Sequence, residues 1–167
     1  MNVQTGHQNQ TGMDTHRIEE HQHDPYMRHA KWREPCYCPE CEAVFHEGRW
    51  QWLPMPECAE AVLCPACLRV RDHVPAAYLT LAGEYFVLHR EEIMHLVGRI
   101  EREEKRAHPL KRIMSVDEQE NNLVILYTDP HLARATGRAL QSAYKGELNV
   151  ETQTGEYLLR VLWQRNK

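Results

Sequence analysis

Two Cys-x-x-Cys pairs, CPEC at residues 38–41 and CPAC at residues 64–67, decide the fold of the first half of this chain. In each pair the two intervening residues let both sulfurs face one metal, while nearby backbone N–H groups point at the thiolates. The 22 residues between the pairs slightly exceed the usual spacing of about 15 to 20. Because Zn²⁺ takes four soft ligands at tetrahedral angles, the pairs predict one zinc ion. Its expected ligands are Cys38, Cys41, Cys64 and Cys67.

The segment between the pairs predicts a β-hairpin. Residues 43–46 and 49–52 have the pattern of short strands, and Gly48 provides the turn, so the whole is a zinc ribbon. The alternative is two redox-active dithiols, but such motifs occur at a strand-to-helix junction of an α/β fold, and no βαβ pattern surrounds either pair. Four thiolates leave no open position for water, so we expect a structural zinc ion rather than a catalytic one.

Three further side chains lie near the pairs in sequence. Cys36 and Cys58 are able to compete for the metal, pair with each other or remain free, and we expect free thiols. His46 follows the first pair by five residues and is a possible replacement for a thiolate. Its place on a predicted strand favours an ordinary solvent or core histidine instead.

Composition and charge narrow the class of protein. The chain has 167 residues, of which 42% are apolar and 26% charged, as in globular proteins. Six cysteines in metal-type spacing without an apolar leader predict a reducing, cytoplasmic location. No apolar run approaches the roughly 20 residues that span a bilayer, so no membrane partner is expected. The net charge of −4 differs from the basic surface typical of nucleic-acid binders.

Residues 1–28 differ in composition from the rest of the chain. They are rich in Gln, Thr, Asn and Gly without apolar periodicity, and we expect a disordered tail. The irregular spacing of its histidines favours a solvated tail over a metal-binding one. Order is expected to begin near residues 24–27, with Tyr26, Met27 and Trp32 as the first anchors.

A long helix is predicted after the ribbon, from about residue 84 to residue 107. Residues 79–83 before it are interpreted as a short connection. Pro109 ends the helix, so residues 108–110 mark the expected boundary between two domains. The apolar stripe of the helix consists of Phe86, Ile93, Leu96, Val97 and Ile100.

The last third of the chain has the pattern of a ββαββ unit. Alternating residues predict a hairpin from strands 112–117 and 123–128, and a second from strands 148–152 and 156–163 with a turn at 154–155. We expect these four strands to form one sheet that a single helix covers.

The helix between the hairpins has clear start and stop signals. Asp129 is the expected N-cap, Pro130 the first helical residue and Gly146 the terminator. Its expected buried stripe is Leu132, Thr136, Ala139, Leu140 and Ala143. The chain is therefore predicted to be an α+β protein with a disordered tail at 1–28, a zinc ribbon at 29–75, a connecting segment and helix at 76–110, and a ββαββ unit at 111–167.

The chain resembles a family of small bacterial zinc-ribbon proteins of unassigned function. The resemblance rests on the two cysteine pairs and on GRWQW at 48–52, HPLKRI at 108–113 and HLAR at 131–134. More distantly, the pairs and residues 112–165 are similar to the amino-terminal region of the archaeal and eukaryotic adaptor that escorts large ribosomal subunits, including an arginine on the last strand, here Arg160. That adaptor carries two zinc sites and further domains, whereas this chain provides cysteines for one site. The resemblance implies ribosome binding as an expectation.

Local charge ranks the candidate partner surfaces. Residues 32–72 contain four basic and seven acidic side chains, so the ribbon is unsuited to binding phosphates. Residues 111–167 contain eight basic and seven acidic side chains. Helical spacing places Arg134, Arg138 and Lys145 on one side of the predicted helix, as a candidate face for RNA or an acidic partner. Trp32, Trp50 and Trp52 are expected to fill the thin ribbon core rather than to stack on bases.

Motifs of common enzyme classes are missing from the sequence. There is no Gly-x-x-x-x-Gly-Lys-Ser/Thr loop, no Gly-x-Ser-x-Gly elbow and no His-Glu-x-x-His pair. We expect a non-catalytic binding module, with an adaptor for ribosomes, RNA or a translation protein as the leading hypothesis. A protein-interaction module without nucleic acid is the alternative. A thiol enzyme that uses Cys36 or Cys58 is the third hypothesis.

Overall fold

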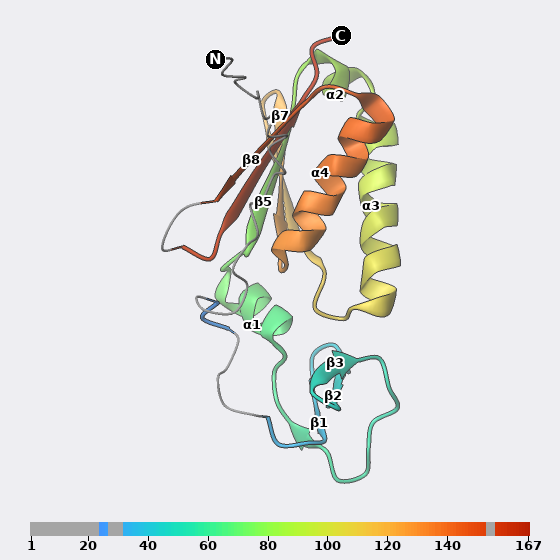
Figure 1. Cartoon of the computed structure of the whole chain (residues 1–167), viewed down its shortest axis with the longest axis vertical. Coiled ribbons are helices and arrows are strands. Elements are labelled where there is room, and N and C mark those ends of the chain that lie inside the picture. The colour runs from blue at the N-terminus through green and yellow to red at the C-terminus, as the bar shows by residue number, and fades with distance from the viewer. Residues whose placement is uncertain (1–23, 27–31, 153–155) are drawn as a thin grey trace, which may run out of the picture.

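The computed structural model describes residues 24–26, 32–152 and 156–167 and contains two sheets with helices, in an α+β arrangement (Figure 1). The predicted tail, except residues 24–26, and the predicted turn at 154–155 lie outside the described residues. We call residues 32–75 the ribbon and the described part of residues 76–167 the sheet unit. No described helix has the length and apolar character that crossing a membrane requires.

The ribbon is a small four-stranded sheet in the order β3-β2-β1-β4. Its strands are β1 Cys36–Tyr37, β2 Val44–His46, β3 Arg49–Gln51 and β4 Glu60–Ala61. β2 and β3 form the predicted hairpin, and Gly48 in its turn has a φ of 78°. Three aromatic rings fill the space beside it: Trp32 lies edge-on to Trp50 with 5.7 Å between ring centroids, and Phe45 contacts both. The expected packing role of Trp32 and Trp50 is confirmed.

A helix that was not predicted from the sequence begins within the second cysteine pair. This helix, α1 Pro65–Asp72, begins with Pro65 at its first position and is followed by the C-cap residue His73, whose φ of 55° is left-handed. Arg69 on its inner side is 2% exposed and forms an ion pair with Asp24, while its guanidinium stacks over Tyr26 at 4.5 Å. The expected anchoring by Tyr26 is therefore confirmed.

The sheet unit contains five strands and not the four expected. Their order is β6-β7-β5-β9-β8, with β5 antiparallel to β7 and parallel to β9. The strands are β5 Ala77–Ala82, β6 Ile113–Gln119, β7 Asn122–Tyr127, β8 Glu147–Thr152 and β9 Leu159–Gln164. The two predicted hairpins are present, but β5 separates them, and the interpretation of residues 79–83 as a connection is wrong.

The position of β5 also corrects the expected division of the chain. Ala77, Leu79 and Leu81 of β5 are completely buried and share one core with residues of both hairpins. The segment 76–110 is thus an integral part of the sheet unit and not a linker between two domains.

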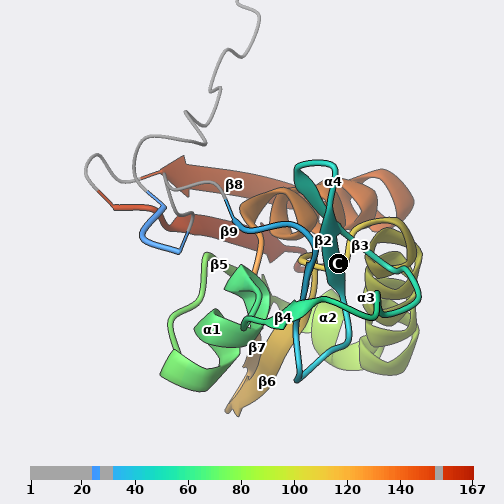
Figure 2. The same ribbon diagram turned by 90° about the horizontal axis from the view of Figure 1, so that it is seen from below.

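Three helices lie on one face of this sheet (Figures 1 and 2). They are α2 Glu84–Leu88, α3 Arg90–Ala107 and α4 Pro130–Tyr144. The predicted long helix is interrupted at His89, and its expected stripe faces the core, with Phe86, Ile93 and Val97 buried.

The end signals of α4 are confirmed. Asp129 is the N-cap and accepts a hydrogen bond from the backbone N–H of Leu132 at 2.9 Å. Ala143 is exposed, against the prediction, whereas Ala133 and Gly137 are buried. Gly137 allows close packing because a Cβ there would lie 2.8 Å from Cγ1 of Val161 and 2.9 Å from Cδ1 of Leu148.

The ribbon lies against the end of the sheet unit where α3 stops (Figure 1). The indole N–H of Trp52 donates a hydrogen bond to the carbonyl of Lys105 at 2.7 Å. Leu110, just beyond the helix, packs against the ribbon core. The expectation that the long helix joins the two parts is supported by these contacts at its C-terminal end.

Candidate metal centre

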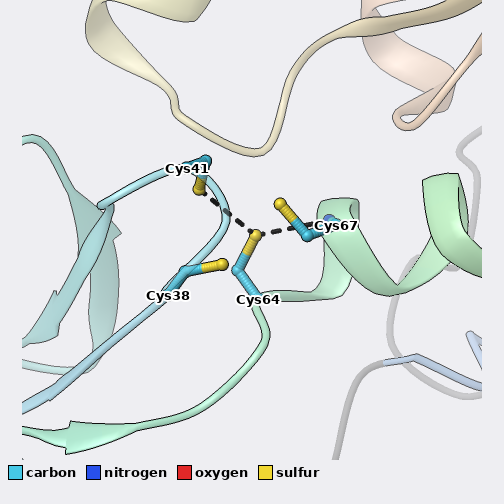
Figure 3. Close-up of side chains that lie close together, drawn as sticks. All are labelled: Cys38, Cys41, Cys64 and Cys67. Carbon is cyan, nitrogen blue, oxygen red and sulfur yellow. Dashed lines mark hydrogen bonds between the residues drawn. The ribbon is translucent and has the colours of Figure 1, made fainter.

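The four predicted zinc ligands converge on one point, although they come from two separate segments (Figure 3). Cys38 follows β1 directly and Cys41 completes the tight turn after it, in which the Glu42 N–H bonds the Cys38 carbonyl at 2.8 Å. Cys64 is the N-cap of α1 and Cys67 lies in its first turn. The short strands and the helix start therefore present both pairs to a common centre.

The sulfur positions fit a tetrahedral metal ion. All four Sγ atoms lie within 4.8 Å of one another, and those of Cys41 and Cys64 are 3.7 Å apart. A tetrahedron with Zn–S bonds of about 2.3 Å has edges of about 3.8 Å. The Cys67 N–H also donates to the Cys64 sulfur at 3.4 Å, as expected for a knuckle that stabilises a thiolate. The arrangement defines a candidate four-cysteine zinc centre.

The thiols influence each other because they lie so close together. The hydrogen bond between the Cys41 and Cys64 sulfurs lowers the pKa of Cys41 to about 5. The same contact, together with burial, raises the pKa of Cys64. Metal binding requires both groups as thiolates, so zinc binding is accompanied by proton release.

An arginine from the sheet unit completes the surroundings of the centre. The Nη2 of Arg112 donates to Cys67 Sγ at 3.2 Å and to Cys64 Sγ at 3.4 Å. Arg112 was not predicted to lie at the centre, because its distance from the second pair along the chain gives no sign of contact. It was included in the predicted strand 112–117 and in the segments that carry the resemblance, but without a role at the metal centre.

The other candidates near the cysteine pairs lie outside the cluster. Cys36 is buried in β1, and burial raises the pKa of its thiol. Cys58 is exposed, and both residues are free thiols. His46 is exposed on β2 and is not among the four clustered residues.

A groove of about 410 Å³ lies beside the centre. It is lined by Glu40, Leu63, Cys67, Val70, Arg71 and Arg112. Its charged lining is mixed, and Arg112 is already engaged with the sulfurs, so we assign no ligand to it.

The predicted basic face divides into two parts. Arg134 and Arg138 both line a groove of about 650 Å³ between α4 and β8, whereas Lys145 is not among its lining residues. The helix ends at Tyr144, and Lys145 leaves it with a φ of 62°, so the helical spacing no longer applies there. The remaining lining is Gln141, Leu148, Asn149, Val150, Glu151 and Thr152.

Trp52 differs from the other two ribbon tryptophans. It is 39% exposed, and its indole N–H contacts the Lys105 carbonyl. It therefore joins the ribbon to the sheet unit instead of filling the ribbon core.

No protein-family model matches the chain, and searches of curated proteins and of solved structures find no significant match. The class of the protein is therefore defined by its own geometry, which is that of a zinc-ribbon module joined to an α+β unit with a mixed sheet.

Proposed function

We propose that this protein is a non-catalytic zinc-ribbon adaptor that binds an extended, acidic segment of a protein partner along β8. The observation that carries the proposal is the groove between α4 and β8, in which Arg134 and Arg138 stand beside an edge strand. The zinc ion stabilises the fold of the ribbon, and the sheet unit binds the partner.

The shape of the groove favours an extended segment. Five consecutive residues of β8, 148–152, line it. Since successive side chains of a strand point to opposite faces, a groove that touches all five follows the edge of the strand. Within the described residues β8 pairs only with β9, so its outer backbone groups are available to an added strand.

The charge of the groove favours acidic residues in that segment. Arg134 and Arg138 place two guanidinium groups beside the edge, and guanidinium groups bind carboxylates in a bidentate manner. Glu151 on the same edge lies in register with Arg160 of β9, which is suited to offset its charge.

RNA or a ribosome is the second candidate partner, and it rests on the resemblance described above. The net charge of −4, the acidic ribbon and Glu151 in the groove argue against tight binding of a phosphate backbone. Binding of RNA or a ribosome is therefore the competing outcome of the experiment.

The absence of catalysis and a cytoplasmic location belong to the same proposal. Four thiolates fill the coordination sphere of zinc, and a thiolate centre needs a reducing compartment. A thiol enzyme would need a reactive cysteine outside the centre, and burial makes Cys36 a poor candidate. Rapid alkylation of Cys36 or Cys58 with zinc retained would support the enzyme instead.

The proposal is tested by NMR titration of the zinc-loaded protein with three probes. These are an alternating Val-Asp hexapeptide, the matching Val-Asn hexapeptide and a ten-nucleotide uridine RNA. We expect the Val-Asp peptide to shift the amide resonances of β8 and the Val-Asn peptide to bind at least fivefold more weakly. The double substitution Arg134→Glu and Arg138→Glu should remove binding, while the control Lys145→Glu, just beyond the end of α4 and outside the groove, should leave it unchanged.

The competing outcomes are distinct. If the RNA shifts the resonances and its binding weakens steeply with salt, the RNA adaptor takes the place of the protein adaptor. Sedimentation of the wild type with ribosomes at low salt would point in the same direction. If no probe shifts β8 at millimolar concentration, the groove is not the binding site.

A further inference from the structure

Arg112 is held rigidly where its side chain reaches the metal centre. Its backbone N–H donates to the hydroxyl of Thr128 at 2.9 Å, and its carbonyl accepts from the Thr128 N–H at 2.9 Å. The Thr128 hydroxyl also donates to the Leu110 carbonyl at 2.6 Å. Thr128 lies between β7 and α4, so the frame of the sheet unit fixes the position of Arg112.

The chemistry of the cluster calls for a cation at this position. Zn²⁺ with four thiolates carries a net charge of −2, and Cys38 and Cys64 are fully buried. Buried charge is costly unless hydrogen bonds and opposite charge compensate it. The Arg112 guanidinium supplies both, because one nitrogen reaches the sulfurs of Cys64 and Cys67.

Other contacts also join the ribbon to the sheet unit, and in one of them the Arg69 guanidinium lies 5.4 Å from the ring centroid of Tyr157. Leu110 packs against the ribbon core, and Trp52 donates to the carbonyl of Lys105. Neither contact involves opposite charges. Arg112 therefore provides an interaction between the ribbon and the sheet unit whose strength depends on the charge of the cysteine cluster.

We propose that Arg112 is a positioning residue that makes the docking of the ribbon on the sheet unit depend on the metal ion. With zinc bound, Cys64 and Cys67 are thiolates held at fixed positions, and Arg112 donates charge-assisted hydrogen bonds to them. When zinc leaves, nothing holds the four sulfurs in their common geometry. Arg112 then loses its acceptors, and the ribbon separates from the sheet unit while the sheet unit stays folded.

Zinc release measures the effect of Arg112 on the centre. The variants are Arg112→Gln and Arg112→Lys, and the control is Arg99→Gln, an exposed arginine on α3. Transfer of zinc to a chromogenic chelator should be about 10-fold faster for Arg112→Gln, since outer-shell partners typically change metal affinity 10- to 100-fold. The control should match the wild type. Arg112→Lys keeps the charge and should fall between the two.

Two spectroscopic readouts separate this role from general destabilisation. In the cobalt-substituted protein, Arg112→Gln should shift the thiolate-to-metal charge-transfer band to longer wavelength, because the sulfur lone pairs lose a hydrogen bond. The indole N–H resonance of Trp52, assigned with Trp52→Phe, should move to its unbonded position in zinc-loaded Arg112→Gln and in the metal-free wild type alike.

The result that overturns the proposal is equally specific. Zinc release within twofold of the wild type, an unshifted cobalt band and an unchanged Trp52 resonance in Arg112→Gln would show that Arg112 is not coupled to the metal. A Trp52 resonance that keeps its bonded position in the metal-free wild type would also overturn it. If Arg112→Gln does not fold, the same three measurements on Arg112→Lys decide, and wild-type values in all of them reject the proposal.

Discussion

Leu79 of β5 lies directly opposite Ile125 of β7, and both side chains are completely buried. This pair joins the segment before the long helix to the first hairpin after it. On its other side Leu79 is in register with Val161 of β9, from the second hairpin. The central strand of the sheet therefore comes from outside the ββαββ segment that it completes.

The first prediction concerns independent folding of the sheet unit. A fragment of residues 111–167 lacks β5 and leaves the edges of β7 and β9 without their partner, so we expect it not to unfold cooperatively. A fragment of residues 76–167 contains the whole core and should show cooperative thermal unfolding and dispersed amide resonances. Cooperative unfolding of the shorter fragment would restore the original boundary at residues 108–110.

The second prediction concerns the metal. Cys64→Ser should abolish stoichiometric zinc binding, because it removes a ligand to which Cys41, Cys67 and Arg112 all make contacts. Without zinc the ribbon should unfold while the sheet unit keeps its melting transition, since structural zinc contributes free energy of folding. Elemental analysis and amide resonances measure the two effects. The control Cys58→Ser changes an exposed free thiol and should retain full metal content.

The third prediction compares two helical glycines. Gly137→Ala should destabilise the protein by about 1 to 3 kcal/mol, because the added Cβ would meet Val161 and Leu148 below 3.0 Å. In Gly98→Ala the nearest atom is the mobile Nη1 of Arg102 at 3.3 Å. This variant should gain roughly 0.5 to 1 kcal/mol from helix propensity. Urea unfolding measures both, and a Gly137→Ala variant that is as stable as the wild type or more stable would show that the packing of α4 on the sheet is looser than described.

The fourth prediction concerns pH. The Lys111 ammonium donates to the Glu104 carboxylate at 2.9 Å and lowers the pKa of that carboxyl. A lowered folded-state pKa stabilises the protein above the unfolded-state pKa, and this stability is lost as the pH falls through the folded-state value. Glu104→Gln should thus cost at most about 1 kcal/mol at neutral pH, since the pair is partly solvated.

The cost of Glu104→Gln should shrink towards zero near pH 3. Urea unfolding at both pH values tests this, with Glu103→Gln at an exposed neighbouring position as the control. An equal loss of unfolding free energy at neutral and acidic pH would show that Glu104 stabilises the protein by packing and not by its charge.

The parts of the structure that sequence patterns predicted are those with local causes. The cysteine spacing predicted the cluster, and Asp129 with Pro130 predicted the start of α4, because metal knuckles and helix caps need only neighbouring residues. β5 was missed because the six-residue stretch AYLTLA before Gly83 has no hairpin partner nearby. Its partners are β7 and β9, which follow much later in the chain.

The same distinction applies to the candidate sites. Arg112 was missed because its direction depends on Thr128 and on how the ribbon lies against the sheet unit. Lys145 was grouped with Arg134 and Arg138 because helical spacing was extended one residue beyond the helix. The first case required the position of one element relative to another and the second the residue at which a helix ends, and periodicity contains neither.

The parallel pairing of β5 with β9 has a consequence for synthesis of the chain. Ala77 pairs with Leu159, about 80 residues later, so loop closure over this distance must precede completion of the sheet. During translation β5 and its apolar residues emerge well before β9 does. The ribbon, whose contacts are local, is able to fold around zinc in this interval. The five-stranded sheet forms only after β9 has been synthesised, and we expect it to fold slowly for a chain of this size.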